Sequence, residues 1–324
     1  MVCDLTGLPV ANASLLDEGT SAAEAMTLFF GVKNKKNKAV VANRFLVSDR
    51  VFPQTISVLK TRAEPLGIDV VIMHFADFDL SESTFGVLIQ YPDSEGSVED
   101  FSALTAEAKS KEIYVTVACD LMSLALLEAP GVWGADCAVG NAQRFGVPMG
   151  FGGPHAAYFA ISEEFKRLIP GRIIGVSVDK LGNPALRMAL QTREQHIRRE
   201  KATSNICTAQ ALLAIMASMY AVYHGPKGIF KISKRIHDLT SLLAANLRKL
   251  DISFPHKSFF DTLTIDCSTG FKMKVREEAE KRNINFFYNT QSLQISIDET
   301  VLLEDIKEIF EVFCAVLKLQ KYDI

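Results

Sequence analysis

The chain has 324 residues, of which 48% are hydrophobic and 23% are charged, so it can bury a sizeable core and is long enough for one large and one smaller domain. A net charge of -3 gives no electrostatic reason to expect nucleic acid, and the longest apolar run, which starts at Ala209, is too short and too polar to span a membrane. The six cysteines lack the paired spacing of a zinc site or a redox dithiol, and the first twenty residues contain no visible targeting peptide.

Strand and helix patterns alternate through the first part of the chain. A helix over 20–30, entered through Thr20, precedes a strand over 38–46 and a helix that begins at Pro53 and closes near Gly67. Ser97 and Asp100 resemble a capping box that opens a further helix over 98–111. The remaining strands are predicted over 68–75, 84–92, 112–120, 134–140, 155–162 and 172–179. Several are almost continuously apolar, so we expect an α/β architecture with a mainly parallel sheet.

Long helical patterns replace this alternation from about Thr203. One amphipathic helix ends at Gly225 and Pro226, and a second covers 227–250. The elements predicted after it are a strand over 261–267, a helix over 274–283, a strand over 292–298 and a helix over 301–320. We therefore predict a large α/β domain over 1–225 and a small α+β domain over 226–324, with a long helix bridging them.

Two polar sites stand where a ligand could bind. Gly19, Thr20 and Ser21 lie at a predicted helix start, where backbone N–H groups and the helix dipole could hold a phosphate. Thr20 or Ser21 as an ordinary N-cap explains the same residues. Asp120 ends a predicted strand at the carboxyl edge of the sheet, where it could pair with the protonated ring nitrogen of pyridoxal phosphate or cap the helix that follows.

The segment 140–160 resembles a cofactor loop, because a strand leads into a turn rich in glycine and proline and back into a strand. A pyridoxal-phosphate enzyme needs a lysine here to form the Schiff base. This turn offers Gln143 and Arg144 instead, and neither can form that bond. His155 is better explained as a turn or core histidine than as a catalytic base.

A strongly basic segment lies between Leu190 and Ala211. Its basic residues are Arg193, His196, Arg198, Arg199 and Lys201. They could form a solvated helix face or a surface for an anion or a partner, and the sequence leaves both interpretations open. No motif for metal-dependent or nucleophilic hydrolysis stands out.

Long stretches in family order make the chain resemble the glycine decarboxylase family, the P-protein of the glycine cleavage system. These stretches are 5–26, 86–101, 142–160, 187–214, 223–228 and 294–300. The resemblance covers nearly the whole chain and is to the N-terminal half of the long single-chain form, or to the separate first subunit of the split form. The family's opening segment is missing, so we expect a chain truncated at its start.

The resemblance implies the aspartate aminotransferase-like fold of type I. It also implies the decarboxylation of glycine with pyridoxal phosphate and the transfer of the aminomethyl group to the lipoyl arm of the H-protein. The Schiff-base lysine of the family belongs to the second half, and Gln143 falls in its place here. Gly19, Thr20, Ser21 and Asp120 would then form a vestigial site, with the cofactor held by the lysine-bearing partner.

Further expectations follow from the same resemblance. The partners would be a lysine-bearing second half or subunit, the H-protein and glycine, in an oligomer located in the mitochondrial matrix, without nucleic acid or membrane. Where the family usually has His-Pro-Gln-Thr, this chain has Phe52 before Pro53, which replaces a hydrogen-bonding ring with an apolar one. Two alternatives stand beside this: an inactive truncated scaffold or interaction module, and an independent enzyme that uses Lys180 or Lys201, neither of which follows the expected strand and turn.

Overall fold

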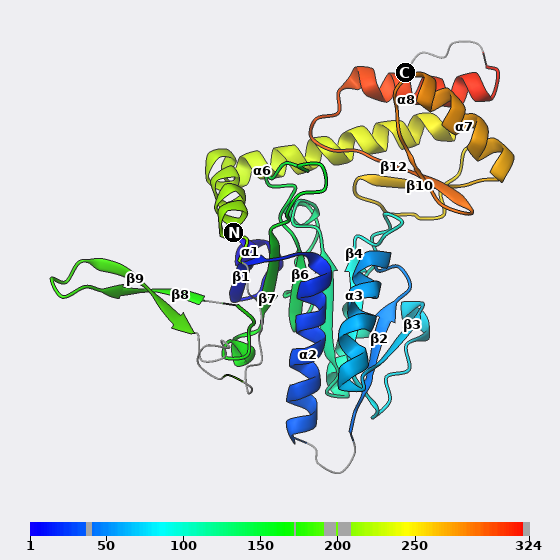
Figure 1. The fold of residues 1–324 in the computed structure, drawn as a ribbon. Coiled ribbons are helices and arrows are strands. Elements are labelled where there is room, and N and C mark those ends of the chain that lie inside the picture. Colours follow the sequence, from blue (N-terminus) through cyan, green and yellow to red (C-terminus); the bar gives the residue numbers. More distant parts are fainter. Residues whose placement is uncertain (37–40, 172, 191–198, 200–208, 320–324) are drawn as a thin grey trace. The chain divides into compact units, whose positions relative to one another are not determined.

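The structure is a computed structural model that describes residues 1–36, 41–171, 173–190, 199 and 209–319 (Figure 1). These residues form two compact units, Met1–Gln90 with Asp100–Gly225 and Tyr91–Glu99 with Pro226–Ile324. The sequence placed the segment Tyr91–Glu99 in the large domain, whereas its contacts belong to the second unit. The Glu95 carbonyl accepts a hydrogen bond from Thr264 Oγ1 at 2.6 Å, for example.

The first unit is built around a seven-stranded sheet with the order β1-β7-β6-β5-β4-β2-β3. Its strands are β1 (Val10–Leu15), β2 (Arg44–Ser48), β3 (Asp69–Met73), β4 (Thr84–Tyr91), β5 (Tyr114–Cys119), β6 (Cys137–Asn141) and β7 (Ala157–Ile161). Strand β2 runs parallel to β3 and β4, and β5 runs parallel to β6. Strand β7 is antiparallel to both of its neighbours, β1 and β6. The mainly parallel sheet expected from the sequence is confirmed.

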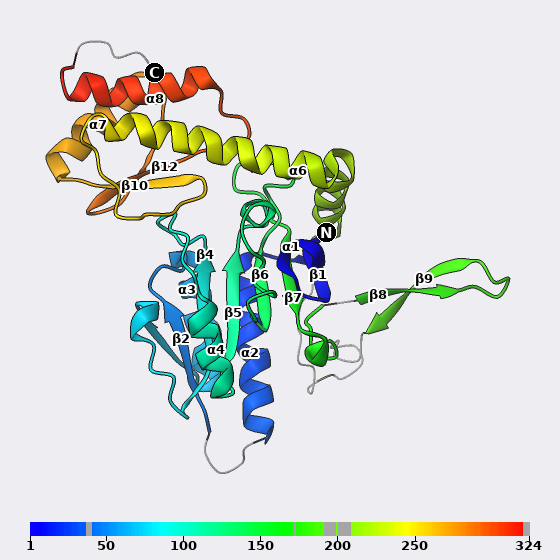
Figure 2. The same ribbon diagram turned by 180° about the vertical axis from the view of Figure 1, so that it is seen from behind.

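Helices cover both faces of this sheet. The α-helices of this unit are α1 (Val2–Thr6), α2 (Glu18–Lys36), α3 (Pro53–Ala63), α4 (Ser102–Ser110) and the first part of α6 (Ala211–Arg248), up to Gly225. Helices α2 and α3 lie over one face in Figure 1, and Figure 2 shows α4 on the other. The apolar core between α2 and the sheet includes Met26, Phe29, Phe45, Phe85 and Phe159. Burial on both faces explains why the middle of β4, residues 85–89, reads as an apolar run.

The predicted strand over 172–179 does not join the central sheet. It is β8 (Ile173–Val178), which pairs only with β9 (Pro184–Leu190) in a two-stranded antiparallel hairpin. Figures 1 and 2 both show this hairpin extending away from the sheet. The sequence alone could not distinguish the two cases, because a short apolar run fits a buried strand and an exposed hairpin equally well.

Other differences from the sequence prediction are local. The capping box predicted at Ser97 is wrong: α4 begins at Ser102, whose N–H donates to Asp100 Oδ1 at 2.9 Å, while Ser97 Oγ donates to Glu99. Strands β1 and β9 were not predicted. Strand β1 has the sequence VANASL, which lacks a clear apolar alternation, and its pairing with β7 is what makes it a strand.

The second unit packs helices against a three-stranded antiparallel sheet with the order β10-β12-β11. Its elements are β10 (Thr262–Asp266), α7 (Thr269–Lys281), β11 (Phe287–Tyr288), β12 (Ser292–Ser296) and α8 (Leu303–Val316). The long helix α6 (Ala211–Arg248) is interrupted at Gly225, whose φ of 61° and ψ of 175° are not helical. The helix end predicted at Gly225 and Pro226 is therefore confirmed, and two helices meet there. Among the described helices, none is long and apolar enough to cross a bilayer.

Candidate functional site at the carboxyl edge of the sheet

The strand directions bring three chain segments to one edge of the central sheet. Because β5 and β6 are parallel, Asp120 after β5 and the loop 142–156 after β6 leave the sheet on the same side. Strand β1 is antiparallel to β7, which is antiparallel to β6, so β1 also ends here and leads directly into α2. This edge is the usual ligand position in α/β sheets, and we treat it as the candidate site.

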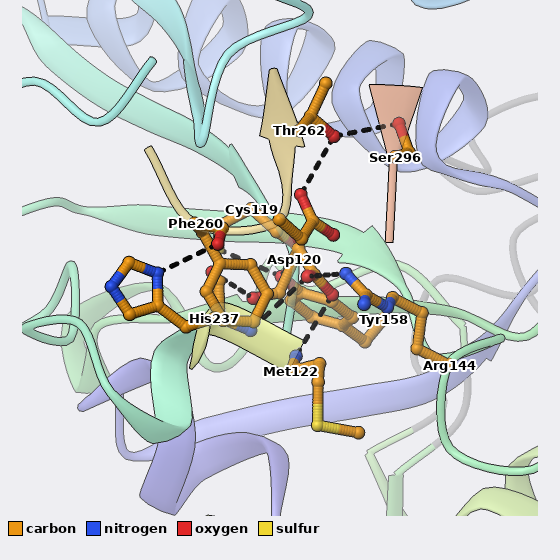
Figure 3. Close-up of polar contacts among 11 residues, drawn as sticks. Cys119, Asp120, Met122, Arg144, Tyr158, His237, Phe260, Thr262 and Ser296 are labelled. Carbon is orange, nitrogen blue, oxygen red and sulfur yellow. Dashed lines mark hydrogen bonds and ion pairs between the residues drawn. The ribbon is translucent and has the colours of Figure 1, made fainter. Parts of the chain in front are cut away.

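Asp120 is held by backbone amides and by a guanidinium group. Its carboxylate accepts hydrogen bonds from the N–H groups of Met122 and Ser123 at 3.0 and 3.3 Å, so it caps the turn that follows β5. Arg144 Nη1 lies 2.6 Å from Asp120 Oδ2 (Figure 3), and the two side chains are 24% and 22% exposed. The negative charge of Asp120 is therefore neutralised by the chain's own arginine. The sequence had treated Arg144 only as a residue that cannot replace lysine.

The start of α2 is capped by Asp17, one residue before the helix. Asp17 Oδ1 accepts a hydrogen bond from the Thr20 N–H at 2.7 Å, and the Asp17 carbonyl accepts one from the Ser21 N–H at 3.0 Å. The prediction that Thr20 or Ser21 serves as the N-cap is therefore wrong, because the helix begins earlier, at Glu18. A carboxylate already occupies the positive end of this helix.

Gly19 and Ser21 face the protein interior. A Cβ atom at Gly19 would lie 3.1 Å from Val58 Cγ2, so glycine allows α2 to pack closely against α3. Ser21 is completely buried, and its Oγ has no hydrogen-bond partner among the described residues. Close packing is sufficient to explain the glycine, and the hydroxyl of Ser21 is a buried polar group to which the described part of the chain gives no structural role.

Glu18 is a titratable residue at this edge that sequence reasoning did not single out. Its Oε1 accepts a hydrogen bond from Thr55 Oγ1 at 3.0 Å. Burial raises the pKa of Glu18 to about 7, and the negative charges of Asp120 and Asp17 act in the same direction, against hydrogen bonds from Thr55 and Gln90. The sequence feature that could have pointed to a buried polar group here was Gln90, a polar residue near the end of an otherwise apolar strand.

The loop 142–156 is closed by its own hydrogen bonds. The Gln143 N–H donates to Asn141 Oδ1 at 2.8 Å, and Asn141 Nδ2 lies 2.6 Å from His155 Nδ1 across the loop. Phe145 is buried against the ring of Tyr220 from α6. Gln143 and Asp120 are thus brought to the same edge, where Arg144, the next residue after Gln143, pairs with Asp120. No lysine occurs between residues 141 and 165.

Beneath the edge, β5, β6 and β7 pack closely around Gly140. Tyr158 donates a hydrogen bond to the Cys119 carbonyl at 2.6 Å, and its hydroxyl lies 3.0 Å from Cys119 Sγ. A Cβ atom at Gly140 would lie 2.3 Å from the Cys119 carbonyl oxygen, so only glycine fits there. Burial raises the pKa of Cys119 to about 12, so this thiol is neutral and is no nucleophile.

The remaining candidates from the sequence lie elsewhere. Arg193, His196, Arg198 and Lys201 of the basic segment fall outside the described residues. Lys180 is exposed in the turn between β8 and β9, away from the loop 142–156. Phe52 precedes α3 and is 37% exposed. Within the described part of the chain, no group of three or more His, Cys, Asp or Glu side chains could hold a metal ion.

The architecture is that of the pyridoxal-phosphate-dependent enzymes of fold type I, as expected. A sphingosine-1-phosphate lyase from Burkholderia pseudomallei matches at 14% identity with a TM-score of 0.68, covering 95% of this chain and 70% of that one. A cysteine desulfurase from Thermococcus onnurineus matches at 15% identity with a TM-score of 0.67, covering 98% and 82%. At these identities the likeness shows the fold alone.

More specific matches identify the family. A solved glycine decarboxylase (P-protein) of the glycine cleavage system, in inhibitor-bound form, matches at 30% identity with a TM-score of 0.88, covering 98% of this chain and 74% of that one. The family profile described as glycine cleavage system P-protein matches residues 1–313. The chain belongs to the P-protein family, which confirms the resemblance drawn from its sequence.

The curated relatives are much longer than this chain. Glycine dehydrogenase (decarboxylating) of Nostoc punctiforme is 55% identical over 316 residues, which are 97% of this chain and 32% of the relative. The protein of the same name from Flavobacterium johnsoniae is 53% identical over 317 residues, which are 98% and 33%. The chain therefore spans about a third of the length of these relatives.

Proposed function

We propose that this chain is the half of a glycine-decarboxylating P-protein that holds no cofactor itself. It would pair with a lysine-bearing second half, help to shape the active site of that half, and so contribute to the decarboxylation of glycine and the transfer of its aminomethyl group to the lipoyl arm of the H-protein. The observation that carries the proposal is Gln143 in the loop 142–156, because an amide cannot form a Schiff base with an aldehyde.

The other groups at the sheet edge also fit pyridoxal phosphate poorly. Asp120, which would meet the ring nitrogen, is already paired with Arg144 at 2.6 Å. The first turn of α2, which would meet the phosphate, is capped by the carboxylate of Asp17. A dianionic phosphate placed there would be repelled by that carboxylate. We therefore assign the pyridoxal phosphate of this family to the second half, and we assign no catalytic step to Gly19, Thr20, Ser21, Asp120 or Gln143.

Covalent trapping tests this assignment. The chain is incubated with pyridoxal phosphate, alone and together with the second half of the Nostoc punctiforme relative, then reduced with borohydride and mapped by peptide mass spectrometry. We expect a stoichiometric pyridoxyl-lysine adduct on the second half and none at a specific lysine of this chain. A specific adduct on this chain, at Lys180 or Lys201 for example, would refute the proposal.

A second candidate function is an inactive fragment that serves only as a scaffold or interaction module. It is favoured by the share of the relatives' length that the chain lacks. Glycine-dependent exchange of labelled CO2, measured on the mixture of this chain, the second half and H-protein, separates the two. If the exchange requires this chain, the catalytic assembly is supported. If the exchange is the same without this chain, the scaffold is supported.

The cellular location stays a prediction. We propose the mitochondrial matrix from the family resemblance, although the curated relatives are bacterial. Immunofluorescence of the native protein against a matrix marker tests it, and a cytosolic signal would refute it.

A further inference from the structure

The side chains of Asn141 and His155 meet at the base of the loop 142–156. Asn141 is the last residue of β6, and His155 lies shortly before β7 begins. Asn141 Nδ2 lies 2.6 Å from His155 Nδ1. Beside this contact, the Ala142 N–H donates to the Ala156 carbonyl at 2.7 Å. A backbone hydrogen bond and a contact between two side chains therefore hold the base of the loop together.

A backbone amide fixes which atom of Asn141 faces the imidazole. The Gln143 N–H donates to Asn141 Oδ1 at 2.8 Å, and a backbone N–H can only donate. The amide oxygen of Asn141 therefore faces Gln143, and its NH2 group faces His155. Because the NH2 group is also a donor, His155 Nδ1 accepts through a free lone pair. The contact thus requires an imidazole without a proton on Nδ1.

A proton on His155 Nδ1 costs Asn141 one of its two hydrogen bonds. With the amide as it stands, two donors would face each other across 2.6 Å. If the amide turned over, its oxygen would accept from the imidazolium, but its NH2 group would then face the Gln143 N–H. Histidine is the side chain that ordinarily changes charge between pH 5 and 8. Acid therefore removes a hydrogen bond from the base of the loop in either arrangement.

The charged and titratable groups around the loop are engaged with other partners. Arg144, in the loop itself, pairs with Asp120 after β5 at 2.6 Å. Helix α6 faces the loop through Tyr220, and the ring centroid of His224 lies 4.4 Å from that of Tyr220. In the part of the chain that the structure describes, His155 makes no ion pair. A proton on its ring therefore acts on the loop through the amide of β6.

The tip of the loop has few attachments beyond its base. Met149 is 78% exposed, and Phe151 is fully exposed with a φ of 55°, in the left-handed region. The N–H groups of Gly152 and Gly153 both donate to the Met149 carbonyl at 3.1 Å. These bonds shape the turn without tying it to the sheet. On the side of β6 the tip follows the buried Val147, and on the side of β7 it depends on the base contact.

We propose that Asn141 and His155 form a proton-sensitive latch, which keeps the loop 142–156 closed while His155 is neutral and releases it when His155 takes a proton. The loop carries Gln143 and Arg144, so the latch controls the mobility of the sheet edge to which they belong. The inference goes beyond the proposed function, because it concerns this chain's own loop whichever half holds the cofactor.

Hydrogen exchange of the full chain at pH 8 and pH 5 tests the latch. Mass spectrometry of peptides that cover the loop gives protection factors, which remove the direct effect of pH on the exchange chemistry. His155→Phe keeps a ring and removes both nitrogens. Asn141→Asp still accepts from the Gln143 N–H and places an acceptor opposite His155. The control is His74→Phe, because His74 Nδ1 also accepts a backbone N–H, from Ala76 at 3.3 Å, but lies outside the loop.

The expected results differ between the variants. In the wild type and in His74→Phe, the protection factor of the loop should fall at least about fivefold from pH 8 to pH 5, the effect of one lost hydrogen bond. In His155→Phe it should be low at both pH values. In Asn141→Asp it should be at least as high at pH 5 as at pH 8, since a carboxylate accepts from a protonated ring. Peptides of α2 report whether each variant is folded.

Three outcomes would overturn the latch. The first is a wild-type loop with equal protection at both pH values. The second is a fall in His155→Phe as large as in the wild type, which would assign the response to another group, such as Glu18 or Asp136, whose pKa values burial raises to about 7 and about 6. The third is a fall of wild-type size in Asn141→Asp, which decides the matter even if His155→Phe does not fold. None of these outcomes affects the trapping experiment, so the proposed function is tested separately.

Discussion

The negative charges of Asp120 and Glu18, two carboxylates at the same sheet edge, meet different partners. Asp120 accepts two backbone hydrogen bonds and pairs with Arg144, whereas the described partners of Glu18 are neutral groups, Thr55 and Gln90. Burial therefore raises the pKa of Glu18 to about 7. The comparison shows that residues of the same chemical type, set at one edge, differ in charge state because of what the tertiary fold places beside them.

This difference bears on the proposed function. A carboxylate already neutralised by a guanidinium group has little electrostatic attraction left for a pyridinium ring, and a carboxyl with a pKa of about 7 carries less negative charge at neutral pH than an ordinary glutamate. Asp120 and the start of α2 stand where a cofactor site would lie, but their charged groups are already paired within the chain.

The largest effect is expected when Asp120 loses its cation. Arg144→Met should lower the free energy of unfolding by about 3 kcal/mol, because a largely buried carboxylate is left with backbone amides alone. Urea denaturation near neutral pH measures it. Lys111→Met removes a pair with Glu107 that is about half exposed and should cost less than about 0.5 kcal/mol. Equal losses in the two variants would show that Asp120 and Arg144 are not specially coupled.

Glu18→Gln should change the pH dependence of stability. The folded state keeps the Glu18 proton up to about pH 7, whereas the carboxyl in the unfolded chain releases it near its ordinary pKa of 4.5, so wild-type stability falls as pH rises through this window. The variant should thus exceed the wild type by up to about 3 kcal/mol above pH 8 and match it near pH 4.5. Denaturation curves across this range measure the difference, with exposed Glu64→Gln as control. If Glu18→Gln were less stable than the wild type at high pH, the conclusion that the charge of Glu18 has no cationic partner would be wrong.

The start of α2 distinguishes the cap found in the fold from the one predicted from sequence. Asp17→Ala should cost about 1 kcal/mol of unfolding free energy, since it removes the acceptor for the Thr20 N–H. Thr20→Ala should change the stability by no more than a few tenths of a kcal/mol, because its side chain is not the cap. Thermal melts of both variants measure this. A larger loss for Thr20→Ala would restore the sequence prediction.

The smallest effect is expected at Ser21. Its buried hydroxyl has no partner among the described residues, so Ser21→Ala should be neutral or stabilising by roughly 0.5 kcal/mol. Thr55→Val, which removes the partnered hydroxyl that donates to Glu18, should instead destabilise by about 1 kcal/mol. Chemical denaturation of the two variants measures the contrast. A destabilised Ser21→Ala would mean that the hydroxyl has a structural role after all.

Much of the fold could be predicted from local pattern. Pro53 marks the first turn of α3, and the apolar runs of β4 and β5 read as buried strands, because these signals are written within a few neighbouring residues. The capping box at Ser97 failed because the segment 91–99 is held by contacts with the second unit, which local pattern does not contain. Strand β1 was missed because only its pairing with β7 defines it.

The sequence by itself determined the family, the alternation of strands and helices, and the absence of a lysine from the loop 142–156. These follow from residue identity and order alone. Only the tertiary structure decided that Arg144 neutralises Asp120 across 24 positions, that Thr55 bonds Glu18 across 37, and that one face of the hairpin β8–β9 stays exposed. Charge state and exposure depend on which distant side chains the fold brings within hydrogen-bonding distance, and no local pattern records that.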